Sequence, residues 1–237
     1  MLHSFVTRTT VRPNNMVRRL YQQIADQIRE LIDNGEFPVG TRLPAERDLA
    51  QKLGVSRPSL REALIALEIE GSVDIRMGSG VYITAAPSSR LNQSRSLGDS
   101  PSELMQARAA IEGAAIVLSA CRITDEALAH LRQLLDEMKA EIEAGNKPLD
   151  IDRQFHLIIA EQSGNSILSR LVSELFDERH SPISAQLRVK YEDRETWHRA
   201  LDEHIAIVDA LEAKDPLLAQ AAMHTHLDRS RRRWIET

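Results

Sequence analysis

Cysteine, aromatic residues and long apolar runs are all scarce in this chain of 237 residues. The single cysteine, Cys121, excludes an intramolecular disulfide and any zinc site built on paired thiolates. The longest apolar run, residues 114–121, is interrupted by Ser119 and is far shorter than the roughly 20 residues that a membrane-spanning helix needs. Residues 1–16 contain arginines but no apolar core of a secretory signal. We therefore expect a cytoplasmic protein that does not enter the membrane.

An excess of positive charge is also absent, because 30 Lys and Arg stand against 35 Asp and Glu, a net charge of −5. Residues 1–84 hold 11 basic and 10 acidic residues (+1), whereas residues 85–237 hold 19 and 25 (−6). Hydrophobic residues make up 42% of the chain, which excludes a mainly disordered protein. A nearly neutral first third can still carry a local cationic face of the kind that contacts phosphates.

The first third of the chain has the pattern of three helices followed by a β-hairpin. Apolar spacings of three and four predict helices between residues 20 and 34, 43 and 54, and 56 and 71, with Pro44 at the start of the second. Alternating apolar residues around a glycine-containing turn predict a hairpin over residues 73–83. This order is typical of a winged helix-turn-helix.

A linker divides this segment from the rest of the chain. Residues 85–99 are rich in Ser, Pro and Gly and lack regular apolar spacing. We therefore place a winged helix-turn-helix domain at residues 17–84 and a second domain at residues 100–237. The second domain shows six helical patterns and no convincing strand, so we expect it to be an all-α bundle and the whole fold to be mainly α.

Arginines gather around the start of the third predicted helix. Arg57 and Arg61 are four residues apart opposite its apolar stripe, with Ser59 between them, and Arg47 on the preceding helix adds a third guanidinium. Guanidinium groups in such a position can bond guanine O6 and N7 in the major groove or clamp phosphates. The alternative is that each arginine is a solvated surface residue without a partner.

Four segments of the first domain resemble the DNA-binding domain of the GntR family of bacterial repressors: LPAERDLA (43–50), VSRPSLREAL (55–64), LEIEG (67–71) and IRMGSGVYI (75–83). The resemblance covers nearly all of residues 19–84. It implies operator contacts from Arg47, Arg57 and Arg61, supported by Ser56, Ser59 and Gly78. Pro58 stands where many relatives have threonine, and it offers no hydroxyl group to a phosphate.

The second domain contains four candidate metal ligands. Asp152 and His156 are four residues apart on one predicted helix and therefore share a face, while His204 and His226 lie beside inward-facing positions of two later helices. One carboxylate and three imidazoles would bind a divalent transition metal and leave positions for water or a carboxylate ligand. A buried, hydrogen-bonded polar cluster is the alternative. The other histidines have no partner at ligand spacing: His3, His130, His180, His198 and His224.

Three segments of this domain resemble the FCD ligand-binding domain of the FadR branch of the same family: Asp152-Arg-Gln-Phe-His156 with Gly164-Asn165, Glu203-His204-x-x-Ile207, and His226-Leu227. This looser resemblance covers residues 101–234. It implies a bundle of six or seven helices with Asp152, His156, His204 and His226 as metal ligands, and zinc is the ion we favour. The fatty acyl-CoA regulator of that branch is not expected to carry this quartet, so its ligand is not transferred to this chain.

Arg108 is the candidate residue for binding an anionic effector. It lies between Ala107 and Ile111 on the first helix of the bundle, where an unpaired guanidinium would be costly to bury. A carboxylate would satisfy it in bidentate geometry, and relatives have an arginine in this part of the helix. An internal ion pair with Glu112 is the alternative. The arginines near the C-terminus are interpreted as a solvated helix end.

These features predict a transcriptional regulator rather than an enzyme. A homodimer would place two winged helices on a pseudo-palindromic operator, and a small carboxylate at the metal and Arg108 would relieve repression. Residues 20–24 and 67–71 resemble the hexuronate-operon repressors, which favours a sugar acid such as a hexuronate. Two alternatives stay open: a metal-dependent hydrolase or lyase built on the same quartet, and a regulator for which the metal itself is the signal.

Overall fold

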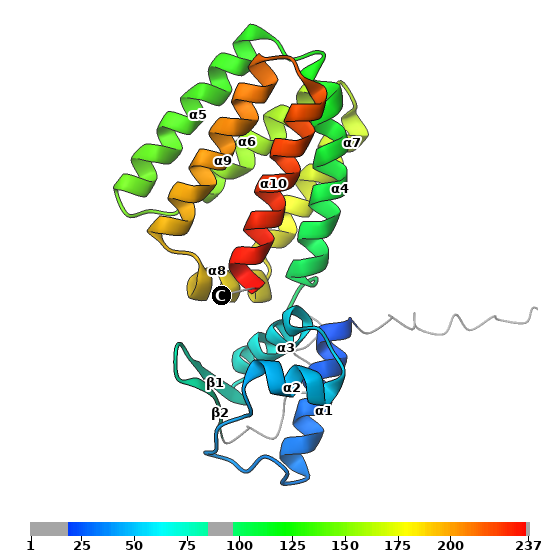
Figure 1. Cartoon of the computed structure of the whole chain (residues 1–237), viewed down its shortest axis with the longest axis vertical. Coiled ribbons are helices and arrows are strands. Elements are labelled where there is room, and N and C mark those ends of the chain that lie inside the picture. The colour runs from blue at the N-terminus through cyan, green and yellow to red at the C-terminus, as the bar shows by residue number, and fades with distance from the viewer. Residues whose placement is uncertain (1–18, 85–96, 236–237) are drawn as a thin grey trace, which may run out of the picture.

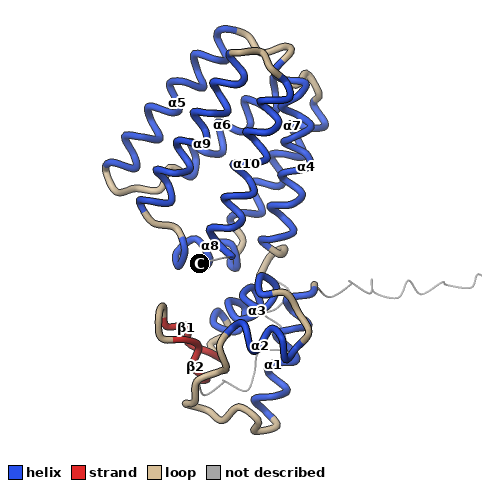
Figure 2. Tube along the Cα trace, in the orientation of Figure 1, coloured by secondary structure: helices blue, strands red, loops and turns tan. Residues whose placement is uncertain are grey.

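The computed structural model describes residues 19–84 and 97–235, which form two helical bodies stacked along the long axis of the molecule (Figure 1). The described residues contain ten α-helices and one two-stranded antiparallel sheet, as the coloured tube of Figure 2 shows. The predicted mainly α fold class is therefore confirmed. Several predicted parts lie outside the described residues. They are most of the linker (residues 85–96), the start of the first domain (17 and 18), the end of the second domain (236 and 237), and His3.

The N-terminal body is a winged helix-turn-helix made of α1 (Leu20–Asp33), α2 (Glu46–Leu53), α3 (Arg57–Ile69), β1 (Val73–Arg76) and β2 (Gly80–Ile83). Helix α3 begins where Ser56 Oγ accepts a hydrogen bond from the backbone N–H of Ser59 at 3.2 Å. The strands pair with Val73 opposite Ile83, so that alternate apolar side chains face the three helices.

One predicted helix start was wrong. Pro44 precedes α2 instead of opening it, and the N-cap of α2 is Ala45. The reason is a competing strand contact, because the backbone N–H of Leu43 donates to Val81 O at 2.8 Å and Arg42 forms a bridge with Tyr82. The segment before α2 is therefore held in extended form against the hairpin.

The C-terminal body is a bundle of seven described α-helices: α4 (Pro101–Ala120), α5 (Asp125–Glu143), α6 (Leu149–Gln162), α7 (Ser166–Asp177), α8 (Pro182–Tyr191), α9 (Arg194–Glu212) and α10 (Pro216–Ile235). Side chains of Ser100, Thr124 and Asn165 cap the starts of α4, α5 and α7. Helix α4 packs against α6, α7 and α10. None of the described helices combines the length and apolar composition needed to cross a lipid bilayer.

Helix α8 was not predicted as a separate element. It is 10 residues long and lies where the two bodies meet (Figure 1), and its buried stripe is half apolar and half polar: Ile183, Leu187, Ser184 and Arg188. Ile183 and Leu187 join the apolar core of the N-terminal body, whereas the buried Arg188 donates to the carbonyl oxygen of Arg179. A helix that packs in two directions has no single apolar face for periodicity to detect.

The two bodies share an apolar and polar interface along α3. Leu97 and two residues of α8 belong to the same buried cluster as the core of the winged helix-turn-helix. Glu62 accepts hydrogen bonds from Ser100 Oγ at 2.7 Å and from the backbone N–H of Ser102 at 2.8 Å. Glu68 pairs with Lys190 at 2.9 Å. The outward side of α3 is therefore bound to the C-terminal body.

Replacing Leu187 by alanine tests this shared core. Leu187 is 1% exposed, so the substitution is expected to cost about 2–5 kcal/mol and to lower the urea midpoint of unfolding. Val189→Ala on the same helix is the control, because Val189 is 73% exposed and its truncation is expected to change stability by less than about 0.5 kcal/mol. Equal midpoints for the two variants would contradict the placement of α8 in this core.

Candidate functional site

Three helices of the bundle bring four buried metal-binding side chains together. Helix α6 carries Asp152 and His156, α9 carries His204 and α10 carries His226, and one ligand atom from each lies within 4.8 Å of the others. His204 Nε2 is 3.2 Å from Asp152 Oδ1 and 3.3 Å from His156 Nε2. The four residues singled out in the sequence therefore meet in one place.

Two acidic residues orient the imidazoles. The Nδ1–H of His156 donates to Glu112 on α4, and the Nδ1–H of His226 donates to Glu203 on α9 at 3.0 Å. His204 Nδ1 is buried without a hydrogen-bond partner among the described residues. Carboxylates in these positions hold a histidine tautomer that leaves Nε2 free for a metal. The sequence analysis had not assigned this role to Glu112 or Glu203, although Glu203 directly precedes a candidate ligand.

The protonation states suit a metal. Burial raises the pKa of Asp152, but the Arg179 guanidinium together with His204 and His156 outweighs this effect and holds the pKa well below the usual range. Burial lowers the pKa of His156, and burial together with neighbouring imidazoles lowers the pKa of His226 well below its ordinary value. An ionised carboxylate and neutral imidazoles are the forms that bind a metal ion.

The separation of the ligand atoms also suits a divalent transition metal. Two ligand atoms bound to one ion at about 2.1 Å lie at most about 4.2 Å apart. The three measured separations among Asp152, His156 and His204 are 3.2, 3.3 and 3.7 Å. This donor set of three nitrogens and one oxygen could therefore hold such an ion.

Arg108 forms the internal ion pair that was the alternative considered from the sequence. Its Nε pairs with Glu112 at 2.6 Å, and its guanidinium lies 3.8 Å from the ring centre of Phe176. Burial by itself raises the pKa of Glu112, but the charges of Arg108 and His156 bring it to about 2. Nη2 of Arg108 has no partner among the described residues, and Arg108 lines a pocket beside the quartet. The internal ion pair thus leaves one donor for another group.

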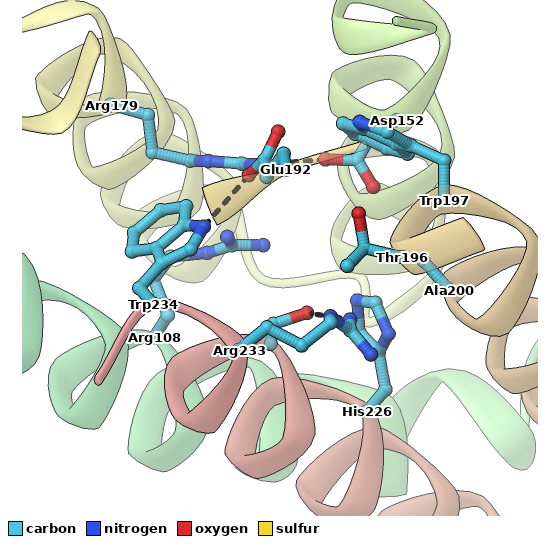
Figure 3. A pocket seen from close by; sticks show the side chains of 11 residues that line it. Arg108, Asp152, Arg179, Glu192, Thr196, Trp197, Ala200, His226, Arg233 and Trp234 are labelled. Atoms are coloured by element: carbon cyan, nitrogen blue, oxygen red, sulfur yellow. Dashed lines mark hydrogen bonds and ion pairs between the residues drawn. The ribbon is translucent and has the colours of Figure 1, made fainter. Parts of the chain in front are cut away.

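This pocket lies between α4, α6, α9, α10 and the segment before α9 (Figure 3). Its cavity volume is about 20 Å³, room for about one water molecule, within about 370 Å³ of space between atoms that includes open solvent. Asp152 and His226 of the quartet line it, together with polar residues that the sequence analysis did not identify: Arg179, Glu192, Thr196, Trp197, Ser230 and Arg233. Arg179 pairs with Asp152, and Arg233 pairs with Glu203 at 3.0 Å. Arg179 and Glu192 lie outside the helices of the quartet and no spacing marks them, whereas Ser230 and Arg233 follow His226 by four and seven residues on α10.

Most of the predicted DNA-binding residues are exposed on the N-terminal body. Arg47 and Arg57 are exposed and have no ion-pair partner in the described part of the chain. Gly78 is exposed at the tip of the hairpin with a φ of +72°, a conformation that favours glycine. Ser56 and Ser59 hold the start of α3 through their mutual hydrogen bonds.

Arg61 differs from the expectation that it shares an exposed face with Arg57. Its side chain is 5% exposed, pairs with Glu46 at 2.7 Å and lies 5.2 Å from the ring centre of Tyr191. Its Nη1 donates to the carbonyl oxygen of Trp234 at 3.5 Å. The physical reason is that α8 and the end of α10 cover this side of α3, which spacing within α3 cannot reveal.

Comparisons with known families match both bodies. Residues 20–83 match the model of bacterial regulatory proteins of the gntR family, and residues 103–229 match the FCD domain. The Uxu operon regulator of Haemophilus influenzae is 33% identical over 224 residues, which are 93% of this chain and 84% of that protein. The Exu regulon transcriptional regulator of Escherichia coli K12 is 34% identical over 219 residues, 90% of this chain and 84% of that protein.

Among solved structures, this chain is similar to that of Streptococcus agalactiae GntR. The sequence identity is 30% and the TM-score is 0.48, with 90% of this chain and 99% of that chain covered.

The contrasting exposure of two arginines on α3 predicts different chemical reactivity. In the native chain, phenylglyoxal is expected to modify Arg57 readily and Arg61 much more slowly, because only Arg57 is open to solvent. Mass spectrometry of peptides after a short exposure measures both rates. In urea, where the interface is lost, the two rates should become equal. Equally fast modification in the native chain would show that Arg61 is not covered.

Proposed function

Because this chain belongs to the GntR family of bacterial regulatory proteins, with an FCD domain after its DNA-binding domain, we propose that a small carboxylate in the helical bundle controls its binding to an operator. The chain is a DNA-binding transcriptional regulator and not an enzyme, as its relatives over about nine-tenths of its length are. The domain limits that we propose are residues 17–84 and 100–237, joined by residues 85–99, and its site of action is the cytoplasm.

The observation that carries the effector site is the buried quartet with an incompletely bonded arginine beside it. We assign Asp152, His156, His204 and His226 as ligands of a divalent transition metal, with zinc preferred. A bound metal supplies a Lewis-acidic centre for carboxylate or hydroxyl oxygens. Arg108 Nη2 supplies a charged hydrogen-bond donor next to it, which is the geometry that orients a carboxylate.

The preferred effector is a sugar acid such as a hexuronate. Two relatives that match most of this chain are named as regulators of the Uxu operon and the Exu regulon. The pocket supports this preference because hydroxyl-bearing and charged side chains line it, rather than an apolar wall suited to a fatty acid.

On the DNA side, Arg47 and Arg57 bind the operator, with Ser56, Ser59 and Gly78 supporting α3 and the hairpin. Arg61 joins them only after it leaves the carbonyl oxygen of Trp234. A homodimer presents two such surfaces to a pseudo-palindromic site, because a two-fold protein matches a two-fold operator. Effector binding then relieves repression.

Trp234 offers a physical route from the pocket to α3. Its indole N–H donates to Glu192 in the pocket at 2.8 Å, while its carbonyl oxygen accepts from Arg61. A ligand that displaces Glu192 or the end of α10 would alter both contacts. A coupling of only about 1–3 kcal/mol changes operator affinity by roughly 5- to 150-fold.

Removing one DNA-contacting arginine tests the regulator surface. Arg57→Ala is expected to weaken binding to an operator selected from random-sequence DNA by about 1–3 kcal/mol, roughly 5- to 150-fold. Fluorescence anisotropy at fixed salt measures the affinity. Arg170→Ala is the control, since Arg170 is exposed on α7 in the other body, and it should bind as the unaltered chain does. Full affinity of Arg57→Ala would remove α3 from the proposed DNA interface.

Removing one imidazole tests the metal site. His204→Ala is expected to weaken zinc binding by at least about tenfold, whereas His198→Ala on the same helix should bind zinc normally. Equilibrium dialysis followed by elemental analysis measures zinc per chain, and circular dichroism checks that both variants are folded. A folded His204→Ala variant with unchanged zinc affinity would refute the assignment of this ligand.

A further inference from the structure

Most of the buried polar side-chain atoms without a partner gather in one pocket. Among the described residues six such atoms are found, and four belong to residues that line the pocket beside the quartet: Arg108 Nη2, Arg179 Nε, Trp197 Nε1 and Glu192 Oε2. Buried polar groups in proteins are almost always hydrogen-bonded, so such a concentration points to a ligand. Three of the four atoms are donors and the fourth is a carboxylate acceptor.

The carboxylate of Glu192 limits what this ligand can be. Its Oε1 accepts from the indole N–H of Trp234, and Oε2 lies buried with an open acceptor position. A second carboxylate on the ligand would meet this group as a like charge, whereas a hydroxyl group would donate to it. The part of the ligand next to Glu192 must therefore carry hydrogen-bond donors.

The arginines of the pocket do not compensate for a second negative charge. Arg108 pairs with Glu112, and Arg179 pairs with Asp152. Each guanidinium already faces a carboxylate of the protein, so only hydrogen-bonding capacity remains. The indole N–H of Trp197, 6% exposed as a residue, likewise offers a neutral donor. A hydroxyl group can donate to Glu192 or accept from Trp197, because it donates one hydrogen bond and accepts two.

We propose that Glu192 and Trp197 are the residues that recognise hydroxyl groups, so that the pocket selects a polyhydroxy monocarboxylic acid and rejects a dicarboxylic acid of the same skeleton. This inference rests on the proposed function, in which Arg108 and the quartet hold the carboxylate. It adds the end of the pocket that distinguishes one acid from another, a role that neither the quartet nor Arg108 can perform. Figure 3 shows Glu192 bonded to Trp234 on the opposite side of the pocket from His226.

Three acids separate the contributions of charge and hydroxyl groups. Isothermal titration calorimetry of the zinc-loaded full chain is carried out with D-glucuronate, with D-glucarate, which adds a second carboxylate to the same skeleton, and with hexanoate, which has no hydroxyl groups. The unaltered chain is expected to bind glucuronate at least about tenfold more tightly than either of the others, a difference of about 1.4 kcal/mol.

Two variants then assign the discrimination to its residues. Glu192→Gln removes the charge at nearly constant shape and is expected to reduce the preference for glucuronate over glucarate by about tenfold. Trp197→Phe keeps a ring but removes the N–H, so glucuronate binding should weaken while hexanoate binding stays unchanged. Glu195→Gln is the control, because Glu195 is exposed on α9 outside the pocket and should keep the original preference.

The outcomes distinguish this inference from the proposed function. If Glu192→Gln and Trp197→Phe bind all three acids as the unaltered chain does, the hydroxyl-recognition role is wrong, while carboxylate binding in the bundle stands. Equal binding of glucuronate and glucarate by the unaltered chain also overturns the inference alone. Failure of the zinc-loaded chain to bind any of the acids would overturn the proposed effector site, and this inference with it.

Discussion

The interior of the helical bundle depends on the mutual compensation of charges that have no access to water. Asp152 and Glu112 are both buried carboxylates, and Arg179 and Arg108 neutralise them at close range. Removing either partner of such a pair would leave an uncompensated charge in a medium of low polarity, which is strongly destabilising. The bundle can therefore hold these groups only in one arrangement. A metal and a small acid require such rigidity, because their ligand atoms must be held at fixed separations.

This polar centre lies in the same bundle as the elements that cover the DNA-binding helix. Helix α10 carries His226 of the quartet and, two turns later, Trp234, whose carbonyl oxygen bonds Arg61 on α3. Helix α8 packs its apolar residues into the core of the winged helix-turn-helix. The pocket and the covered side of α3 therefore share α10, because Trp234 lines the pocket and its carbonyl oxygen bonds Arg61.

Local chemistry explains why much of the fold could be predicted. Several features depend only on residues a few positions away in the chain. They are the serine cap of α3, the capping residues of α4, α5 and α7, and the glycine turn of the hairpin. The start of α2 and the existence of α8 were missed because both depend on partners elsewhere in the chain. Leu43 bonds the hairpin, and Ile183 packs against the other body. The apolar periodicity of a segment cannot reveal partners that lie elsewhere in the chain.

The sequence by itself determined the order of most elements and singled out the four candidate metal ligands that the fold brings together. The i, i+4 spacing of Asp152 and His156 places both side chains on one helical face whatever else the chain does. Only the tertiary structure decided which carboxylates orient the imidazoles, that Glu192 and Trp197 line the same pocket, and that Arg61 is covered while Arg57 is free. These contacts join residues that are far apart in the chain. They depend on how whole helices pack and not on any local preference.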